Sequence, residues 1–594
     1  MGISEVLGLL CGLALFLYGM DVMGDALKKS AGTGLKALLG KMTTNPIKGF
    51  LLGLGVTLII QSSSATTVMV VGFVNSGTMT LLQSVGVIIG ANVGTAITAW
   101  LTALNSLGGE SGADIVGVLS IFKPDSWVPI VAVIGICLIM FVKRGKRKYL
   151  GVVLIGFAIL MTGMTMMSDA VAPLKNDDGF KSLLTMFSNP ILGILAGVIL
   201  TVIIQSSSAS IGILQALTVT GAITYTSAIP IIMGQNIGTC VTAMISSLGA
   251  NKNGKRAAVI HLSFNVIGVV IVSILFYTID AIAGHIGALD SSINAWGVAA
   301  VHTLFKLICV VLIGPFYKQL EKLSHLVIRD KENEGEKVTI LDERLFETPS
   351  VAVKSASDAT AEMARVACNA LKDSLSLIET YDAKKAEYIR TMESKADEYE
   401  DQIGSYLVKL SAHDMADADS NQITKLLHII GDFERISDHA VNIVESAEEM
   451  KDKKVTFSQT AISDIEIMRR AVCDIVDMTY TAFVNNDLQI AKNIEPLEEV
   501  VDLLRDKIKR GHILRLQKSE CDIEHGFVLS DILNNFERVS DHCSNVASCV
   551  IEISEYDALN MHGYTDQVKS NTEAFDQKVK EYASQYVLSR ANEE

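Results

Sequence analysis

The stretch NPIKGFLLGLGVTLIIQSSSA at residues 45–65 recurs 144 residues later as NPILGILAGVILTVIIQSSSA at residues 189–209. Of the 21 paired positions, 14 are identical, and they include the whole Gln-Ser-Ser-Ser run. In each copy this polar run interrupts a long apolar stretch. Polar backbone at membrane depth is tolerated only where it is buried in protein or lines a wet cavity. The sequence therefore predicts two re-entrant helical hairpins, at 45–76 and 189–221, each with the polar run at its tip.

The same offset also pairs residues outside the hairpins. Polar residues and glycines keep their partners without a gap: Gly12, Gly19, Met20, Met23 and Asp25 pair with Gly156, Gly163, Met164, Met167 and Asp169, and Gly90, Asn92, Gly94, Thr95 and Thr98 pair with Gly234, Asn236, Gly238, Thr239 and Thr242. A constant offset of this kind indicates an internal repeat. We expect repeat 1 at about 3–142 and repeat 2 at about 149–316.

The charge distribution divides the chain at about residue 328. Residues 1–328 carry 19 basic and 12 acidic residues, a formal +7, whereas residues 329–594 carry 31 and 53, a formal −22. The first part contains apolar segments that can cross a bilayer, which takes roughly 20 residues; they lie at 3–27, 80–104, 128–142, 149–168, 227–248, 257–283 and 296–316. The expected fold is all-α: a polytopic membrane domain at 1–328 and a soluble helical domain at 350–594.

Basic loops set the expected orientation in the cytoplasmic membrane. Lys28–Lys29, Lys143–Lys148 and Asn251–Arg256 should be cytoplasmic, and the loops at 105–114 and 168–179 should be outside. Three crossings then separate the hairpins, so the second repeat is inverted relative to the first. The first span has no basic region before it and is expected to be retained rather than cleaved. Inverted repeats with broken helices are the architecture of secondary transporters.

The chemistry of the two tips suits a small anion and a small cation. Together they offer six hydroxyls and two amides, and helices that begin near Ser64 and Ser208 would direct positive dipole ends at an anion. Freed carbonyls and hydroxyls suit Na⁺. Neither tip contains Lys or Arg, so neutral donors are expected to hold the anion. A single Ser-rich run would more often ease helix packing, but two matched copies favour a binding site.

The doubled motif resembles the type II sodium-dependent phosphate cotransporter family over about residues 1–320. The resemblance implies that inorganic phosphate and sodium bind at Gln61, Ser62, Ser63, Ser64, Gln205, Ser206, Ser207 and Ser208, and, less directly, at Thr66, Asn92, Thr95, Ser210, Asn236 and Thr239. Family members also tend to carry His-x-x-Phe-Asn in later helices. Residues 261–265 (HLSFN) match, but residues 302–306 (HTLFK) have Lys306 in place of Asn. This difference leaves the coupling stoichiometry open.

Four other ionisable residues lie in the apolar segments. Asp25 and Asp169 occupy paired positions near span ends, where anchoring is favoured over a role in transport. His261 and His302 are expected to be hydrogen-bonded packing residues, with proton coupling left open.

The acidic half has the composition of a helical domain after a charged linker at 329–349. Apolar residues recur at helical spacing, which predicts helices at 350–380, 384–411, 415–450, 456–486, 488–517 and 522–555, with a further amphipathic segment at 563–590. This half also repeats, at an offset of 103: residues 433–439 (FERISDH) pair with residues 536–542 (FERVSDH). We therefore expect two three-helix bundles.

Carboxylates four residues apart share one helix face, and four such pairs occur here: Glu393 and Asp397, Glu434 and Asp438, Glu498 and Asp502, Glu537 and Asp541. Two pairs per bundle predict a site for Mg²⁺, Mn²⁺, Ca²⁺ or iron. The alternative is a solvated acidic face with Arg435 and Arg538 as partners. The pattern resembles the PhoU family of phosphate-response regulators, which implies a metal-bearing cytoplasmic regulatory domain. Asp432 pairs with Asn535, so metal occupancy could differ between the sites.

These features predict a carrier that couples a small anion to a small cation by alternating access and has a cytoplasmic helical domain. The two resemblances imply that the anion is phosphate, that the cation is sodium and that the helical domain is regulatory. A phosphate-responsive signalling protein and a phosphate exporter are the alternatives. An enzyme is not expected, because no nucleophile motif accompanies the carboxylates. The acidic half argues against nucleic acid as a partner. Nine scattered cysteines without a Cys-x-x-Cys pair argue against a disulfide framework. Whether the chain forms a homo-oligomer is left open.

Overall fold

The computed structural model describes residues 3–39, 45–106, 124–142, 145–329, 341–518, 521–556 and 572–588. It divides into two compact units, Met1–Val351 and Ala352–Glu594, called here the N-terminal and C-terminal units. Within the described ranges all regular secondary structure is helical, and the only β pairing is an isolated bridge between Thr224 and Ser292. The prediction of an all-α protein is confirmed. The predicted loop beyond Ser106, Lys143 and Arg144 of the basic loop, most of the linker and part of 563–590 lie outside these ranges.

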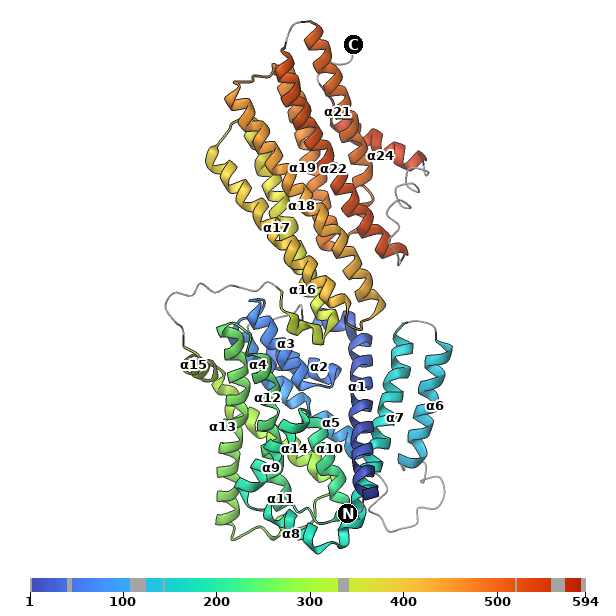
Figure 1. The fold of residues 1–594 in the computed structure, drawn as a ribbon, viewed down its shortest axis with the longest axis vertical. Helices are drawn as coiled ribbons and strands as arrows, with labels where there is room; N and C mark the ends of the chain where they lie inside the picture. Colours follow the sequence, from blue (N-terminus) through green and yellow to red (C-terminus); the bar gives the residue numbers. More distant parts are fainter. Residues whose placement is uncertain are drawn as a thin grey trace. The chain divides into compact units, whose positions relative to one another are not determined.

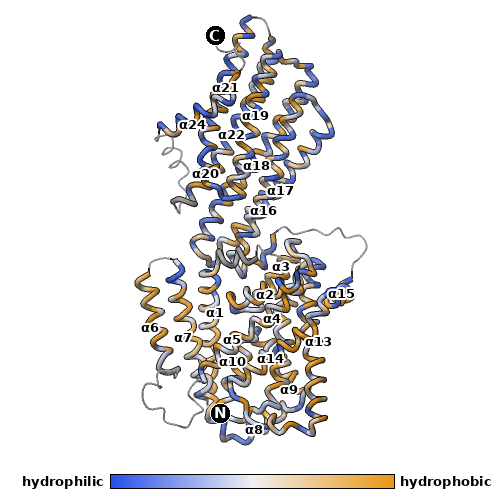
Figure 2. The backbone as a smooth tube through the Cα atoms, turned by 180° about the vertical axis from the view of Figure 1, so that it is seen from behind, coloured by the Kyte–Doolittle hydropathy of each residue, from blue (hydrophilic) through white to orange (hydrophobic). Residues whose placement is uncertain are grey.

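The N-terminal unit is a bundle of helices of very different lengths (Figure 1). They are α1 (Ile3–Leu39), α2 (Pro46–Ile60), α3 (Ser63–Asn75), α4 (Leu81–Gly94), α5 (Ala96–Ala103), α6 (Pro124–Phe141), α7 (Lys146–Val171), α8 (Asp178–Met186), α9 (Pro190–Ile204), α10 (Ser207–Leu217), α11 (Tyr225–Gly238), α12 (Cys240–Ser246), α13 (Lys252–Ile282), α14 (Ala295–Ile313) and α15 (Tyr317–Val327). Figure 2 shows that hydrophobic residues predominate along α6, α7 and α13.

Six helical segments in the described ranges are long and apolar enough to cross a membrane: Ile3–Ala31, Leu81–Ser106, Lys146–Lys175, Tyr225–Ser246, Lys252–Ile282 and Ala295–Val327. Each coincides with one of the seven predicted spans. The seventh, at 128–142, coincides with α6, whose apolar part is shorter.

Helices α1 and α7, which are equivalent in the two repeats, pack against each other through glycines (Figure 1). A Cβ atom on Gly19 would lie 2.4 Å from the Leu160 backbone nitrogen, and one on Gly163 would lie 2.4 Å from the Phe16 backbone nitrogen. These distances are too short for any side chain. The glycines therefore bring the two backbones into direct contact, as small residues do between membrane helices.

The same correspondence extends through the rest of each repeat. The helix breaks at Thr95, between α4 and α5, and at Thr239, between α11 and α12, are 144 residues apart. Glycine packing is also repeated: a Cβ atom on Gly90 would lie 2.0 Å from the Phe50 carbonyl oxygen, and one on Gly234 would lie 2.0 Å from the Ile194 carbonyl oxygen. The sequence duplication is thus a duplication of local structure.

The last part of the predicted linker packs within the N-terminal unit. Residues 341–348, which we call the strap, contain the 3₁₀ turn Glu343–Glu347. The buried Asp342 carboxylate accepts a 2.6 Å hydrogen bond from Asn75 of α3 and pairs with Arg344 at 2.8 Å. Arg344 Nε donates to the Ser246 carbonyl at 2.7 Å, and Leu345 packs over Gly72. The strap is therefore ordered by specific contacts.

The C-terminal unit consists of long helices whose bounds lie close to the predicted ones (Figure 1). They are α16 (Pro349–Leu375), α17 (Ala383–Ser411), α18 (Asp417–Asp452), α19 (Gln459–Asn485), α20 (Leu488–Ala491), α21 (Ile494–Gln517), α22 (Ile523–Tyr556) and α24 (Thr572–Gln585). The predicted helix at 488–517 is interrupted at Lys492–Asn493, which separates α20 from α21.

The paired FERxSDH motifs meet where α18 packs on α22. Asn535 Oδ1 lies 2.8 Å from His439 Nδ1, and Asp432 Oδ1 lies 2.9 Å from His542 Nδ1. The two imidazole rings lie 5.7 Å apart. Burial lowers the pKa of His439. The histidine of each motif thus contacts the residue that directly precedes the other motif. These equivalent contacts join the two halves of the unit.

Candidate functional site

Each Gln-Ser-Ser-Ser tip is a sharp change of direction between two helices. Gln61, after α2, and Gln205, after α9, adopt the left-handed conformation, with φ of 57° and 56°. This conformation is uncommon for any residue other than glycine. Gln61 is held by donating to the Leu58 carbonyl at 2.7 Å and by accepting a 3.1 Å hydrogen bond from Thr98 of α5. The two tips therefore share one strained geometry.

The first serine of each tip caps the helix that follows. Ser62 Oγ accepts from the Ala65 N–H at 3.1 Å, and Ser206 Oγ accepts from the Ala209 N–H at 3.2 Å. Ser62 and Ser206 are thus N-caps of α3 and α10. The next two serines of each tip lie in the first helical turn, whose N–H groups lack intrahelical partners and carry the positive end of the helix dipole.

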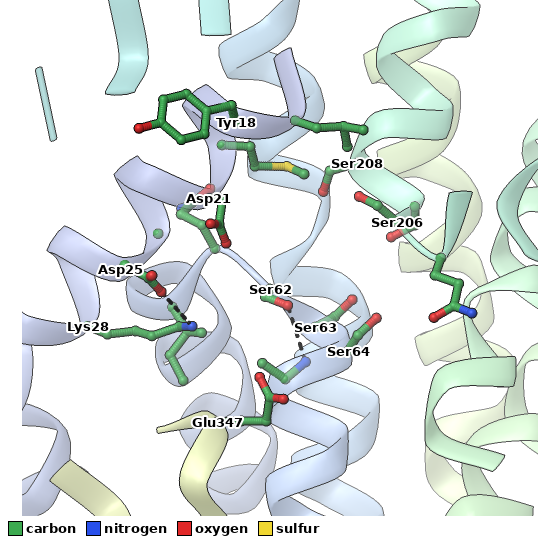
Figure 3. A pocket seen from close by; sticks show the side chains of 18 residues that line it. Tyr18, Asp21, Asp25, Lys28, Ser62, Ser63, Ser64, Ser206, Ser208 and Glu347 are labelled. Atoms are coloured by element: carbon green, nitrogen blue, oxygen red, sulfur yellow. Dashed lines mark hydrogen bonds and ion pairs between the residues drawn. The ribbon is translucent and has the colours of Figure 1, made fainter. Parts of the chain in front are cut away.

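Both tips line one cavity of about 510 Å³. All eight residues of the two Gln-Ser-Ser-Ser runs belong to its wall, and Figure 3 shows Ser62, Ser63 and Ser64 across it from Ser206 and Ser208. The remaining wall comes mainly from α1; the other lining residues are Leu17, Tyr18, Met20, Asp21, Gly24, Asp25, Lys28, Ile60, Ala65 and Glu347. Segments 144 residues apart in sequence are therefore brought to one site.

Charged side chains also line the cavity, and sequence reasoning missed three of them. Lys28 of α1 pairs with Asp25 at 3.0 Å, and Asp21 lies one turn earlier (Figure 3). Glu347 enters from the strap. The expectation that only neutral donors face the anion overlooked Lys28, which comes from another helix. The spacing of three between Asp25 and Lys28 was the only sequence signal for this pair.

The two aspartates at paired positions differ in location. Asp25 lines the cavity, whereas Asp169 is not among its lining residues. The repeats thus contribute equally through their tips but unequally through α1 and α7.

The six less direct site residues lie behind the tips rather than in the cavity wall. All are buried: Thr66, Asn92, Thr95, Ser210, Asn236 and Thr239. Thr57 donates to Thr66 at 3.1 Å, and at the paired positions Thr201 donates to Ser210 at 2.9 Å. The other four donate to carbonyls one turn earlier in their own helices. They therefore support the tips and the adjacent helix breaks.

Four of the eight carboxylates predicted to bind metal lie close to arginines. Arg505 lies 3.3 Å from Asp502 and 2.6 Å from Glu537, and Arg435 lies 3.6 Å from Glu434 and 3.7 Å from Asp438. Sequence reasoning had named Arg435 but not Arg505.

Burial is the main cause of two raised carboxyl pKa values in these patches. It raises the pKa of Glu434 to about 7, with Asp438 adding to the effect, and that of Asp541 to about 6, with Glu537 and Asp502 adding to it. In the part of the chain that the structure describes, no three His, Cys, Asp or Glu side chains are grouped so as to hold a metal ion. The predicted metal sites at Glu393, Asp397, Glu498 and the other carboxylates are not confirmed.

Comparison with known proteins identifies the family of this chain. The family model described as Na⁺/Pi-cotransporter matches residues 15–169 and again residues 159–294, and the PhoU domain model matches residues 360–447 and 465–550. The chain belongs to the Na⁺/Pi-cotransporter family and carries a PhoU domain. Both family models match twice, in agreement with the two internal repeats.

Three relatives of this cotransporter-family chain illustrate its range. YjbB of Escherichia coli K12, assigned by name to inorganic phosphate export, is 22% identical over 562 residues, 93% of this chain and 98% of YjbB. YqeW of Bacillus subtilis, an uncharacterized protein, is 32% identical over 317 residues, 53% of this chain and 96% of YqeW. The rat sodium-dependent phosphate transport protein 2A is 35% identical over 153 residues, 24% of this chain and 23% of that protein. None of these names assigns an enzymatic activity.

Proposed function

We propose that this protein carries inorganic phosphate across the cytoplasmic membrane together with sodium. The single observation that carries the proposal is that both Gln-Ser-Ser-Ser tips line one cavity. Phosphate is small, tetrahedral and anionic, and it can accept hydrogen bonds on every side. Two helix N-termini with serine hydroxyls, together with Lys28, supply donors from several directions.

The sodium ion would bind behind the tips. The interruptions at Thr95 and Thr239 place the last-turn carbonyls of α4 and α11 next to buried threonine and asparagine side chains. Oxygen donors at the C-terminal end of a broken helix stabilise a small cation. Phosphate would then bind at the tips and sodium at the neighbouring interruptions. The hydrogen bond from Thr98 to Gln61 connects the two places in repeat 1 and would couple their occupancy.

Alternating access is the mechanism that the duplication supports. We infer that the two repeats are inverted in the membrane and that α2–α3 and α9–α10 are re-entrant hairpins. The cavity would open to one side and then to the other as the repeats move. The basic loops favour a cytoplasmic location for the C-terminal unit, which we propose acts as a regulatory domain.

Uptake of labelled phosphate into proteoliposomes tests the proposal. An inward Na⁺ gradient should accelerate uptake relative to an equal K⁺ gradient. Uptake that is equally fast in K⁺ would reject sodium coupling, and no uptake in either salt would reject transport.

Phosphate export is the second candidate, and the name of YjbB favours it. The same vesicles, loaded with phosphate and placed in phosphate-free medium, would show export as efflux that needs no inward Na⁺ gradient. A signalling protein that transports little would show neither flux but would still bind phosphate.

A further inference from the structure

Lys306 of α14 is a buried basic residue in the middle of the N-terminal unit. Its side chain is 5% exposed, and Nζ donates a 2.5 Å hydrogen bond to the main-chain carbonyl of Asn92. Within the described ranges no carboxylate lies within ion-pair distance of it. A buried charge in a membrane protein is expensive, and where one is retained it usually serves function.

The acceptor of this hydrogen bond is a carbonyl near the C-terminal end of a helix. Asn92 lies in the last turn of α4, which ends at Gly94 before the break at Thr95. Carbonyls in the last turn of a helix carry the negative end of the helix dipole. The ammonium group therefore lies at the C-terminal end of an interrupted helix, where carbonyl oxygens of transporters coordinate a cation.

The corresponding break in repeat 2 has a neutral partner. There, Asn265 Nδ2 of α13 lies 3.3 Å from Cys240 Sγ, directly after the break at Thr239, and 3.0 Å from the His261 carbonyl. Asn265 ends the HLSFN run, and Lys306 ends the HTLFK run. Each break is thus approached by the last residue of one run: an amide in repeat 2 and an ammonium in repeat 1.

Polar atoms without partners lie in the same helices. Both ring nitrogens of His261 and Nδ1 of His302 are buried and, within the described ranges, have no hydrogen-bond partner. His261 is 1% exposed and His302 is 2% exposed. Buried polar atoms in native proteins are normally paired. These nitrogens therefore indicate a layer that receives water or ions.

The ammonium is also connected to the anion cavity. Thr98 of α5 donates to Gln61, a residue of the cavity wall, at 3.1 Å. Thr98 lies six residues beyond Asn92, on the other side of the break at Thr95. A positive charge at Asn92 thus acts on the first tip from behind, as a bound cation there would.

We propose that the Lys306 ammonium is a built-in cation that takes the place of one coupling sodium ion at the α4–α5 break. The protein then moves one sodium ion fewer per phosphate than it would with asparagine at this position. The inference rests on the proposed function and specifies its ion requirement.

The test compares wild type with Lys306→Asn in proteoliposomes. The ratio of sodium to phosphate is obtained from the Na⁺ gradient that just balances a fixed phosphate gradient at clamped voltage. The ratio should rise by one in Lys306→Asn, and the dependence of the uptake rate on Na⁺ concentration should become steeper. Lys322→Asn, at an exposed lysine of α15, is the matched control and should keep the wild-type ratio. An unchanged ratio in Lys306→Asn overturns the inference.

A second measurement does not depend on transport. The thermal unfolding temperature of the purified protein is recorded in NaCl and in KCl at equal ionic strength. Ligands that bind the native state raise this temperature, so Lys306→Asn should gain more stability from Na⁺ than wild type does. Equal gains, or a variant that fails to fold in both salts, count against the inference.

The outcomes separate this inference from the proposed function. If wild type transports phosphate without sodium and Lys306→Asn acquires sodium dependence, sodium coupling of the natural protein fails but the built-in cation stands. If both depend on sodium with the same ratio, the proposed function stands and the built-in cation fails.

Discussion

Replacing Glu347 with Gln should tighten phosphate binding. Glu347 is an exposed carboxylate in the wall of the cavity that both serine tips line (Figure 3). A bound phosphate would share this space with it, and two negative charges repel. Removing the carboxylate while keeping its shape removes only the repulsion.

The cavity volume sets the magnitude. A volume of about 510 Å³ equals that of a sphere about 10 Å across, so an anion near its centre lies on the order of 7 Å from a carboxylate at the wall. With the dielectric constant of water, two unit charges at this distance repel by roughly 0.6 kcal/mol, and a divalent phosphate by about 1.2 kcal/mol. Glu347→Gln should therefore lower the KM for phosphate about threefold to eightfold.

The assay is the initial rate of phosphate uptake at saturating sodium, over a range of phosphate concentrations. Glu343→Gln is the matched control, because Glu343 is exposed on the same strap but is not a lining residue. Raising the ionic strength with an inert salt should reduce the difference in KM between Glu347→Gln and wild type, since the Debye length falls from about 10 Å at 0.1 M to about 3 Å at 1 M. A KM that is unchanged or higher in Glu347→Gln, or an equal fall in Glu343→Gln, would refute the reasoning.

Three further predictions follow from the cavity, the acidic patch and the glycine packing. Ser63→Ala, like Ser207→Ala in the other tip, should abolish phosphate uptake while the thermal unfolding temperature stays close to that of wild type; wild-type uptake in both variants would contradict the role of the tips. The pKa of Glu434 is raised to about 7, so this carboxyl binds a proton more tightly in the folded protein than in the unfolded chain. Its contribution to the free energy of unfolding is therefore lost as pH rises from about 4.5 through 7. With its side chain 24% exposed, solvent screening reduces this effect, and Glu434→Gln should flatten the pH dependence by roughly 1–2 kcal/mol in denaturant unfolding at pH 5 and pH 8. Gly19→Ala places a Cβ atom 2.4 Å from backbone of α7 and should destabilise the protein by about 1–3 kcal/mol, whereas Gly8→Ala, where the nearest atom is 3.5 Å away, should be close to neutral by the same measurement.

Sequence alone predicted the parts of the fold that depend on local pattern. Apolar runs located the six helical segments that are long and apolar enough to cross a membrane, and helical periodicity located the helices of the C-terminal unit within a few residues. The break between α20 and α21 was missed although Pro496 marks it: proline lacks an N–H for the Lys492 carbonyl and is tolerated in the first turn of a helix, where it lies in α21. These are features that a residue and its near neighbours decide.

The candidate site was predictable only where the duplication exposed it. Residues of the two tips could be named because the same polar run stands at paired positions. Lys28 and Glu347 could not, since only tertiary packing brings α1 and the strap to the tips. The pairing of Arg505 with Glu537 depends on how α21 packs on α22, and spacing within either helix says nothing about it.

The strap has a mechanical consequence. It ends at Thr348, and α16 begins at the next residue, Pro349, as a helix of 27 residues. No slack chain separates the anchored Asp342 and Arg344 from this rigid rod. Glu347 lies two residues before Pro349, so a displacement of the first turn of α16 would also move Glu347 and change its distance from the centre of the cavity. The position of this carboxylate in the cavity wall is thus tied to the start of α16.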